Sequence, residues 1–264
     1  MINRLYPVYS LCCEIGDQRG SNQDRILAKN GTFGRTRLAL FLVADGCGGL
    51  ARGDKISQLL SDSFAQLWES GLLLQNCSSK QHHAYLSTLV CGWLNLVNQF
   101  AFDFGKEIQG RVGSTLSLLV IRNKKYYLYN VGDSRVYLKR NGCLTQLSED
   151  QSYVADMVRN GEISEEEAAH SNKRNILTMC VGGYERVRVY QNKGRIRKGD
   201  VFLLCSDGLY GKIDSRRLEN VVPDIVTDDS ASVLRGCIPP GRASDNVSAI
   251  LVQIRPGPVN ENDF

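Results

Sequence analysis

Histidine, paired cysteine motifs and long apolar runs are all scarce in this 264-residue sequence. Its three histidines, His82, His83 and His170, do not have the spacing of a zinc site. Nine cysteines are present, but none form a C-x-x-C pair. We therefore expect reduced thiols, which are typical of the cytoplasm, and no zinc chemistry.

Features of membrane proteins and nucleic-acid-binding proteins are missing as well. The longest purely apolar run, residues 38–44, is far too short to span a bilayer, and the first residues, MINRLYPVYSLCC, lack the apolar core of a signal peptide. The net charge is +4, and the basic residues are scattered in short pairs such as Lys124-Lys125. We expect a cytoplasmic protein with no membrane span and no nucleic-acid partner.

The composition, 42% hydrophobic and 23% charged, is that of a globular protein with a sizeable core. Neither a Pro/Ser-rich linker nor an internal repeat divides the chain, so one domain over residues 1–254 is predicted, followed by a C-terminal tail at 255–264. The P-loop pattern G-x-x-x-x-G-K-[ST] is absent, which argues against nucleotide binding by that route.

Hydrophobic periodicity predicts strands and helices in separate groups. Apolar residues recur every three or four positions at 56–68 and 85–100, as in amphipathic helices, and Ser164, Ser215 and Asp229 are candidate caps of shorter helices. The pattern favours an α+β fold, with sheets covered by helix layers. Buried strands are predicted at 38–44, 115–121, 126–131, 135–138, 201–205 and 247–254, with 126–131 and 135–138 forming a tight antiparallel hairpin.

Aspartates stand at the ends of these predicted strands. Asp45, Asp133 and Asp207 follow apolar runs directly or after one residue, and Asp245 precedes the last run. In an antiparallel sheet the start of one strand lies beside the end of its neighbour, so we expect all four carboxylates to converge at one sheet edge. Their mutual repulsion calls for hard divalent cations such as Mg²⁺ or Mn²⁺.

A single Asp-Gly step such as Asp45-Gly46 or Asp207-Gly208 is typical of a plain turn. Several such steps, each beside a strong apolar run, are better explained by a metal site. The glycines leave room for a carbonyl ligand and for the approach of a substrate.

An ordered set of motifs over residues 12–254 resembles the type 2C metal-dependent protein phosphatases, in particular their bacterial members. The motifs are Gly16-x-x-Arg19-x-x-Asn22-Gln23-Asp24, Val43-Ala44-Asp45-Gly46-Cys47-Gly48-Gly49, Gly113-Ser114-Thr115, Asn130-Val131-Gly132-Asp133-Ser134-Arg135, Cys205-Ser206-Asp207-Gly208-Leu209 and Ser244-Asp245-Asn246-Val247. The resemblance implies a four-layer α-β-β-α sandwich of two antiparallel sheets flanked by helices.

The resemblance also implies roles for individual residues. Asp45 would bridge two metal ions, Asp207 and Asp245 would complete the first, and the Gly46 carbonyl would reach the second. Asp133 together with Asp207 would match a weaker third site. Asp24 would act through metal-bound water, and Arg19 would hold the phosphate, for which a planar guanidinium is suited.

The implied chemistry is hydrolysis of phosphoserine and phosphothreonine by a water or hydroxide bridging two Mn²⁺ or Mg²⁺ ions, with no phosphoenzyme. The chain departs from the family pattern at three places, one of which is Glu149-Asp150-Gln151-Ser152, where a D-H-S segment is frequent. Gln23 stands where many members have Glu, which removes a charge near the second ion. Cys47 replaces the usual Met or His, and its thiol is either open to oxidation or buried and inert.

Two alternatives remain open: an inactive relative that serves as a phosphoprotein-binding regulatory module, and a phosphatase for small phosphorylated metabolites. The residues at about 151–185 resemble the flap beside the cleft in bacterial members. The expected partners are phosphorylated proteins, the substrates of a cognate Ser/Thr kinase, and the enzyme itself is expected to be a monomer.

Overall fold

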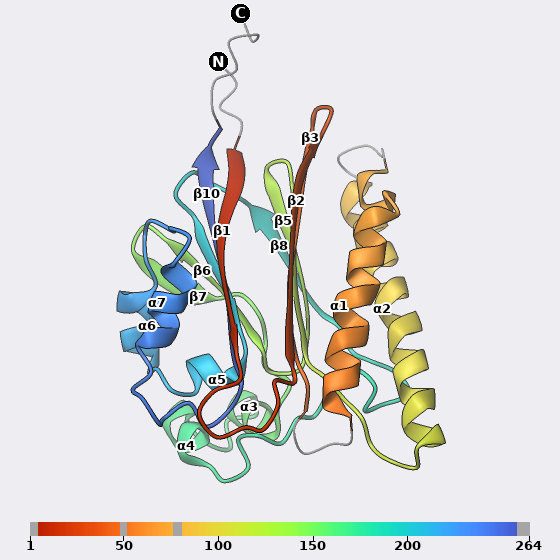
Figure 1. Ribbon diagram of the computed structural model, residues 1–264, viewed down its shortest axis with the longest axis vertical. Coiled ribbons are helices and arrows are strands. Elements are labelled where there is room, and N and C mark those ends of the chain that lie inside the picture. Colours follow the sequence, from red (N-terminus) through yellow and green to blue (C-terminus); the bar gives the residue numbers. More distant parts are fainter. Residues whose placement is uncertain (1–4, 48–51, 76–80, 258–264) are drawn as a thin grey trace, which may run out of the picture.

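The computed structural model describes residues 5–47, 52–75 and 81–257, which form two five-stranded antiparallel sheets packed face to face (Figure 1). In the first sheet the strand order is β1 (Leu5–Glu14), β10 (Val247–Pro256), β9 (Val201–Cys205), β6 (Arg135–Arg140), β7 (Cys143–Gln146). In the second it is β2 (Asp24–Phe33), β3 (Thr36–Asp45), β4 (Leu116–Arg122), β5 (Lys125–Val131), β8 (Tyr190–Arg195).

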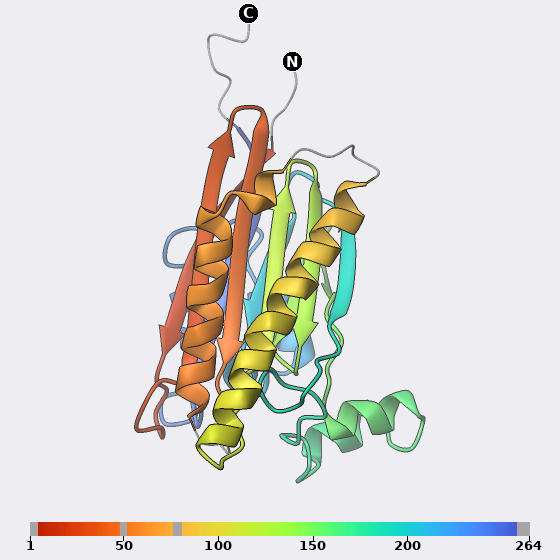
Figure 2. The same ribbon diagram turned by 90° about the vertical axis from the view of Figure 1, so that its right-hand side faces the viewer.

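Helices cover the outer face of each sheet and complete the four layers, as predicted. The two long helices α1 (Gly53–Glu69) and α2 (His82–Glu107) lie on the second sheet, with a short 3-10 turn, η1 (Leu72–Leu74), between them (Figures 1 and 2). Helices α5 (Asp207–Tyr210), α6 (Ser215–Val221) and α7 (Ser230–Gly236) pack on the first sheet. Among the described residues, no helix is long and apolar enough to cross a membrane.

Strand β3 shows why a continuous apolar run forms a strand here. Its even-numbered side chains, such as Leu40 and Leu42, pack under α1 and α2, while its odd-numbered side chains, such as Phe41 and Val43, pack against the first sheet. All four of these side chains are fully buried. Successive residues of a strand point to opposite faces, so a strand buried on both sides has no polar alternation.

The predicted hairpin between 126–131 and 135–138 is wrong. Strand β5 pairs with β4 and β8 in the second sheet, whereas β6 pairs with β7 and β9 in the first. Residues 132–134 cross from one sheet to the other, and Gly132 has a φ of +92° at the crossing. A strand with both faces buried can leave its sheet at such a glycine, and sequence spacing alone does not distinguish this crossing from a turn.

Several predicted boundaries change. Strand β10 continues to Pro256, which pairs with Leu5, so the predicted tail begins too early; residues 258–264 lie outside the described part. Asp214, rather than Ser215, caps α6, and Asp229 stands at the start of α7 without a capping bond. The capping box that begins at Ser164 is confirmed.

The segment expected to be a flap stands apart from the sandwich. Helices α3 (Tyr153–Arg159) and α4 (Glu165–His170) extend beyond the ends of the sheets, and α4 buries no residue (Figure 2). Hydrogen bonds hold the segment at both ends. At the first end, the Gln151 N–H donates to the Gly132 carbonyl oxygen, and the Gly132 N–H donates to Gln151 Oε1. At the second end, Val181 and Ser114 exchange two backbone hydrogen bonds. Both attachments lie beside the predicted site.

Candidate metal centre

Five aspartates gather at one end of the sandwich, opposite the start of β1 and the end of β10, which we call the carboxylate end (Figure 1). In the second sheet, Asp24 begins β2, Asp45 ends β3, and Asp133 follows the end of β5. In the first sheet, Asp207 follows β9 and Asp245 precedes β10. Asp24 and Asp45 are paired residues of neighbouring strands. The convergence predicted from the sequence is therefore present, but it joins two sheets rather than one edge of a single sheet.

The carboxylates lie close enough to perturb one another strongly. Burial raises the pKa of Asp45 well above its usual value, and the charges of the other four aspartates raise it further. Burial followed by the charge of Asp207 has the same effect on Asp133, and burial raises the pKa of Asp24 to about 6. In Asp207 the rise comes from burial and from Asp245. Such crowding destabilises the ionised site unless cations offset it.

The donor set fits hard divalent cations. All five side chains offer carboxylate oxygens, the ligands that Mg²⁺ and Mn²⁺ favour. Asp24 is 1% exposed, and its Oδ1 atom has no hydrogen-bond partner although it is buried. A buried carboxylate oxygen without a partner is costly, so this atom is suited to a water or cation.

The ligand shell is not closed, however. Over the described parts of the chain, no three His, Cys, Asp or Glu side chains are arranged to hold a metal ion as they stand. The carboxylates act on one another through their charges instead, and all four neighbours raise the pKa of Asp45. Donor chemistry and charge thus fit the cations, although the side chains are not yet arranged as a ligand shell.

Arg19, predicted to hold the phosphate, is bound to one of the predicted ligands. Its guanidinium donates to Asp245 Oδ2 over 2.6 Å, and this bond raises the pKa of Arg19. The other oxygen of Asp245 accepts the backbone N–H of Asn246. Both Arg19 and Asp245 are about a third exposed, so the pair lies at the mouth of the site and can open towards solvent.

The Gly113-Ser114-Thr115 motif holds the end of β3. The Ser114 hydroxyl and the Thr115 backbone N–H both donate to the Asp45 carbonyl oxygen, at 3.0 and 2.8 Å. In return, the Asp45 N–H donates to Thr115 Oγ1. The sequence alone assigned no role to this motif. In the structure it fixes the backbone of Asp45.

Asn246 is a positioning residue that sequence reasoning missed. It is 4% exposed, and its Oδ1 accepts the backbone N–H of Gln23 over 2.8 Å. This ties the loop that carries Arg19 to the start of β10. The sequence signal was its place in the Ser244-Asp245-Asn246-Val247 motif, to which no role of Asn246 was assigned. Its Nδ2 donates to two further carbonyl oxygens of that loop, those of Ile15 and Ser21.

The structure gives Gln23 a backbone role. Its carbonyl oxygen accepts from the Gly46 N–H at 3.2 Å and from the Ser57 hydroxyl. A Cβ on Gly46 would lie 2.6 Å from the Gly53 carbonyl oxygen, so only glycine fits after Asp45. Residue 23 therefore holds the metal loop in place through its main chain.

An aromatic and ionic cluster holds the backbone of Asp133. The Tyr210 hydroxyl donates to the Asp133 carbonyl oxygen over 3.0 Å, and the Arg135 guanidinium lies 3.8 Å above the Tyr210 ring. Arg135 in turn forms a two-pronged bond with Asp150. This cluster fixes the crossing between the two sheets at which Asp133 is carried.

Comparisons with known proteins agree with this architecture. The family model for protein phosphatase 2C matches residues 17–238. The chain is 29% identical over 218 residues to the serine/threonine phosphatase stp of Listeria monocytogenes serotype 4b (strain F2365), which covers 81% of this chain and 84% of the relative.

Solved structures are similar over nearly the whole chain. The serine/threonine phosphatase PstP/Ppp of Mycobacterium tuberculosis has a TM-score of 0.79 at 26% identity and covers 95% of this chain and 99% of its own. The catalytic domain of PstP in complex with two manganese ions has a TM-score of 0.77 at 26% identity, with the same coverage.

Proposed function

Because this chain belongs to the protein phosphatase 2C family, we propose that its carboxylate end is the active site at which it removes phosphate from phosphoserine and phosphothreonine in proteins. The chain is a metal-dependent protein serine/threonine phosphatase, in line with its relatives. The observation that carries the assignment of the site is the convergence of five aspartates, in which burial and neighbouring carboxylates raise the pKa values of Asp24, Asp45, Asp133 and Asp207. The inactive binding module is not favoured.

Two Mn²⁺ or Mg²⁺ ions would be held by Asp45, the Gly46 carbonyl, Asp207 and Asp245. Asp133 with Asp207 would hold a weaker third ion. When bound, such cations supply Lewis-acid chemistry, since they lower the pKa of water and offset charge on phosphoryl oxygens. Two manganese ions in the related PstP catalytic domain support this number.

The residues of the chain itself bind the phosphate and orient water. Arg19, once released from Asp245, offers two N–H groups to phosphoryl oxygens. The unpaired Oδ1 of Asp24 accepts a hydrogen bond from a water at the centre, while its Oδ2 is held by the Ser206 hydroxyl over 2.9 Å. No side chain of the assigned set is required as a nucleophile, so hydrolysis is direct.

The test compares a phosphothreonine peptide and p-nitrophenyl phosphate as substrates, with Mn²⁺, Mg²⁺ or EDTA. Asp207→Asn should lose more than about 99% of turnover at saturating Mn²⁺, because one oxygen ligand and one charge are removed from the site. Asp103→Asn, at an exposed position of α2, is the matched control and should keep full activity. An Asp207→Asn protein with more than a tenth of wild-type turnover would sink the assignment.

The substrate class and cellular setting follow as finer proposals. Phosphoproteins made by a cognate Ser/Thr kinase are the substrates, the enzyme is a monomer, and the chain as far as Pro256 acts as one catalytic domain with a flap at 151–185. A cytoplasmic location is supported by the cysteines of the described residues, all eight of which are free thiols. Turnover of phosphorylated metabolites faster than that of phosphopeptides would overturn the protein specificity.

A further inference from the structure

Two cysteines meet where the metal loop and the flap are joined. Cys47 follows Asp45-Gly46, and Cys180 lies in the returning end of the flap, just before Val181. Gly46 and Val181 both bridge to Ser114. The Cys47 N–H donates to the Gly113 carbonyl oxygen over 3.0 Å, and Val181 and Ser114 exchange two backbone bonds of 2.9 and 3.1 Å. One short stretch of chain therefore carries both cysteine segments side by side.

The two thiols interact, and their roles differ. The Cys47 thiol hydrogen-bonds to the Cys180 sulfur, and this bond is the main reason why the pKa of Cys180 is lowered. The positive charge of Arg111 and a bond from the Gly183 backbone act in the same direction. The Cys180 sulfur lies directly against Gly183, so an oxidant that reaches this glycine meets Cys180 first.

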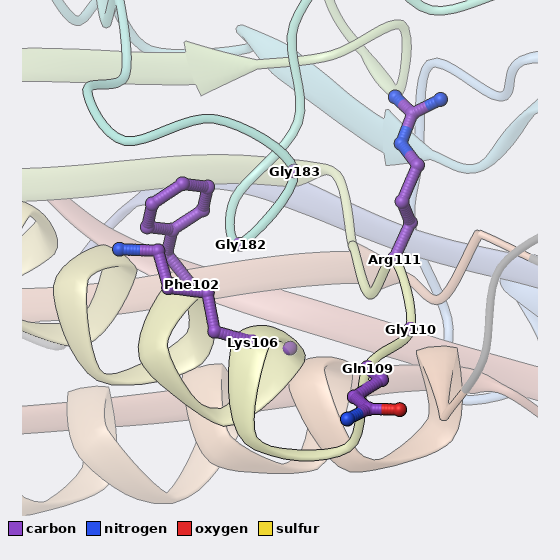
Figure 3. A pocket seen from close by; sticks show the side chains of 8 residues that line it. Phe102, Lys106, Gln109, Gly110, Arg111, Gly182 and Gly183 are labelled. Carbon is purple, nitrogen blue, oxygen red and sulfur yellow. The ribbon is translucent and has the colours of Figure 1, made fainter.

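A pocket brings small solutes close to this pair. Its volume is about 310 Å³, and it lies between the end of α2 and the loop that carries Gly182 and Gly183 (Figure 3). Cys180 is 3% exposed, but Gly183 packs against it so closely that a Cβ there would lie 2.4 Å from the sulfur. Gly183 also lines the pocket. Hydrogen peroxide is small and uncharged, so it can enter such a space.

We propose that Cys47 and Cys180 are a peroxide-sensitive modification site, at which a reversible disulfide fastens the metal loop to the flap and switches the phosphatase off. The Cys180 sulfur attacks one oxygen of hydrogen peroxide, the O–O bond breaks, and a sulfenic acid and one water are formed. The Cys47 sulfur then attacks the Cys180 sulfur, the S–O bond breaks and a second water leaves. The two thiols lose two electrons, and the peroxide gains them.

The loss of activity rests on the function proposed above. Cys47 is the residue after Gly46, whose carbonyl is a proposed ligand, and two residues after Asp45. A disulfide holds its two sulfurs about 2.0 Å apart, closer than a thiol hydrogen bond does, so its formation moves one or both segments. A displacement of about 1 Å at a catalytic group can cost roughly a hundredfold in rate.

The experiment treats the full chain with hydrogen peroxide in EDTA, removes the peroxide, and then measures turnover with Mn²⁺ before and after dithiothreitol. Peptides from a non-reducing digest are mapped by mass spectrometry in parallel. We expect a Cys47–Cys180 linked peptide, a loss of turnover of at least about tenfold, and recovery with dithiothreitol. Cys47→Ser and Cys180→Ser, each compared with its own untreated sample, should resist peroxide, whereas Cys143→Ser, at an exposed position, should behave like wild type.

Peptide mapping separates this proposal from the proposed function. If peroxide abolishes turnover but no linked peptide forms, or if Cys180→Ser loses turnover as wild type does, the switch is refuted. A linked peptide with unchanged turnover also overturns it. If the reduced protein has no phosphatase activity, the proposed function fails, while the linked peptide still reports on the cysteine pair.

Discussion

The pKa of Asp24 predicts an unusual pH dependence for the metal-free protein. Burial, followed by the charge of Asp207, raises this pKa from 3.8 to about 6, although the Ser206 hydroxyl and neighbouring groups lower it in part. Such a carboxyl binds its proton more tightly in the folded state than in the unfolded state. Its contribution to stability is therefore complete below pH 4 and is lost as the pH rises through about 6.

The size of the effect follows from the shift. A rise from 3.8 to about 6 corresponds to about 3 kcal/mol, at about 1.36 kcal/mol per pKa unit. The Asn side chain of the Asp24→Asn variant has nearly the same shape as Asp but does not ionise. In EDTA, the difference in the free energy of unfolding between Asp24→Asn and wild type should thus shift in favour of the variant by up to about 3 kcal/mol between pH 4 and pH 7.

Urea unfolding at several pH values, with EDTA or with saturating Mn²⁺, measures this difference. Mn²⁺ should remove most of it, since cations that bind the folded state stabilise the ionised carboxylates. Asp103→Asn, on the exposed surface of α2, should not shift in favour of the variant between pH 4 and pH 7, because the hydrogen bond from Gln99 lowers the pKa of Asp103. A difference between Asp24→Asn and wild type that stays constant with pH in EDTA would refute the account of a crowded, buried carboxyl.

Three further substitutions probe the supports of the site. Arg19→Ala should raise the KM for a phosphopeptide at least about tenfold, because phosphate loses its guanidinium, and should lower the Mn²⁺ concentration at half-maximal activity, because Asp245 loses a competing partner; an unchanged KM would contradict the role of Arg19. Asn246→Ala should lower the free energy of unfolding by about 1–3 kcal/mol in urea, since three backbone groups lose their partner; a neutral effect would show that the 15–23 loop is held by other contacts. Gly208→Ala should lower the free energy of unfolding by more than about 2 kcal/mol, because its Cβ would lie 1.9 Å from the Asn246 carbonyl oxygen. Gly236→Ala, whose Cβ meets no atom within 4 Å, should be close to neutral. Equal urea midpoints for the two variants would contradict this contact.

Much of the fold was predictable because burial on both faces leaves a strong mark on a sequence. The run at 38–44 is uninterrupted since both of its faces meet a core, and the helices at 56–68 and 85–100 show a clear apolar stripe. Strands β1, β2, β7 and β8 were not predicted from the sequence. Strands β2 and β8 have mixed polar sequences, such as DRILAKNGTF, with little apolar alternation, and β7 is only four residues long. The false hairpin arose because a crossing between sheets and a turn within one have the same spacing around Gly132-Asp133.

The sequence by itself determined which residues carry the chemistry. Aspartates beside apolar runs and ordered motifs are local patterns, and each can be read without knowing its neighbours in space. Only the tertiary structure decided how these residues meet: that two sheets share the carboxylate end, that Arg19 is paired with Asp245, and that Cys47 lies against Cys180. These contacts join segments far apart in the chain, and their distances depend on how the strands are paired and packed, which no local pattern encodes.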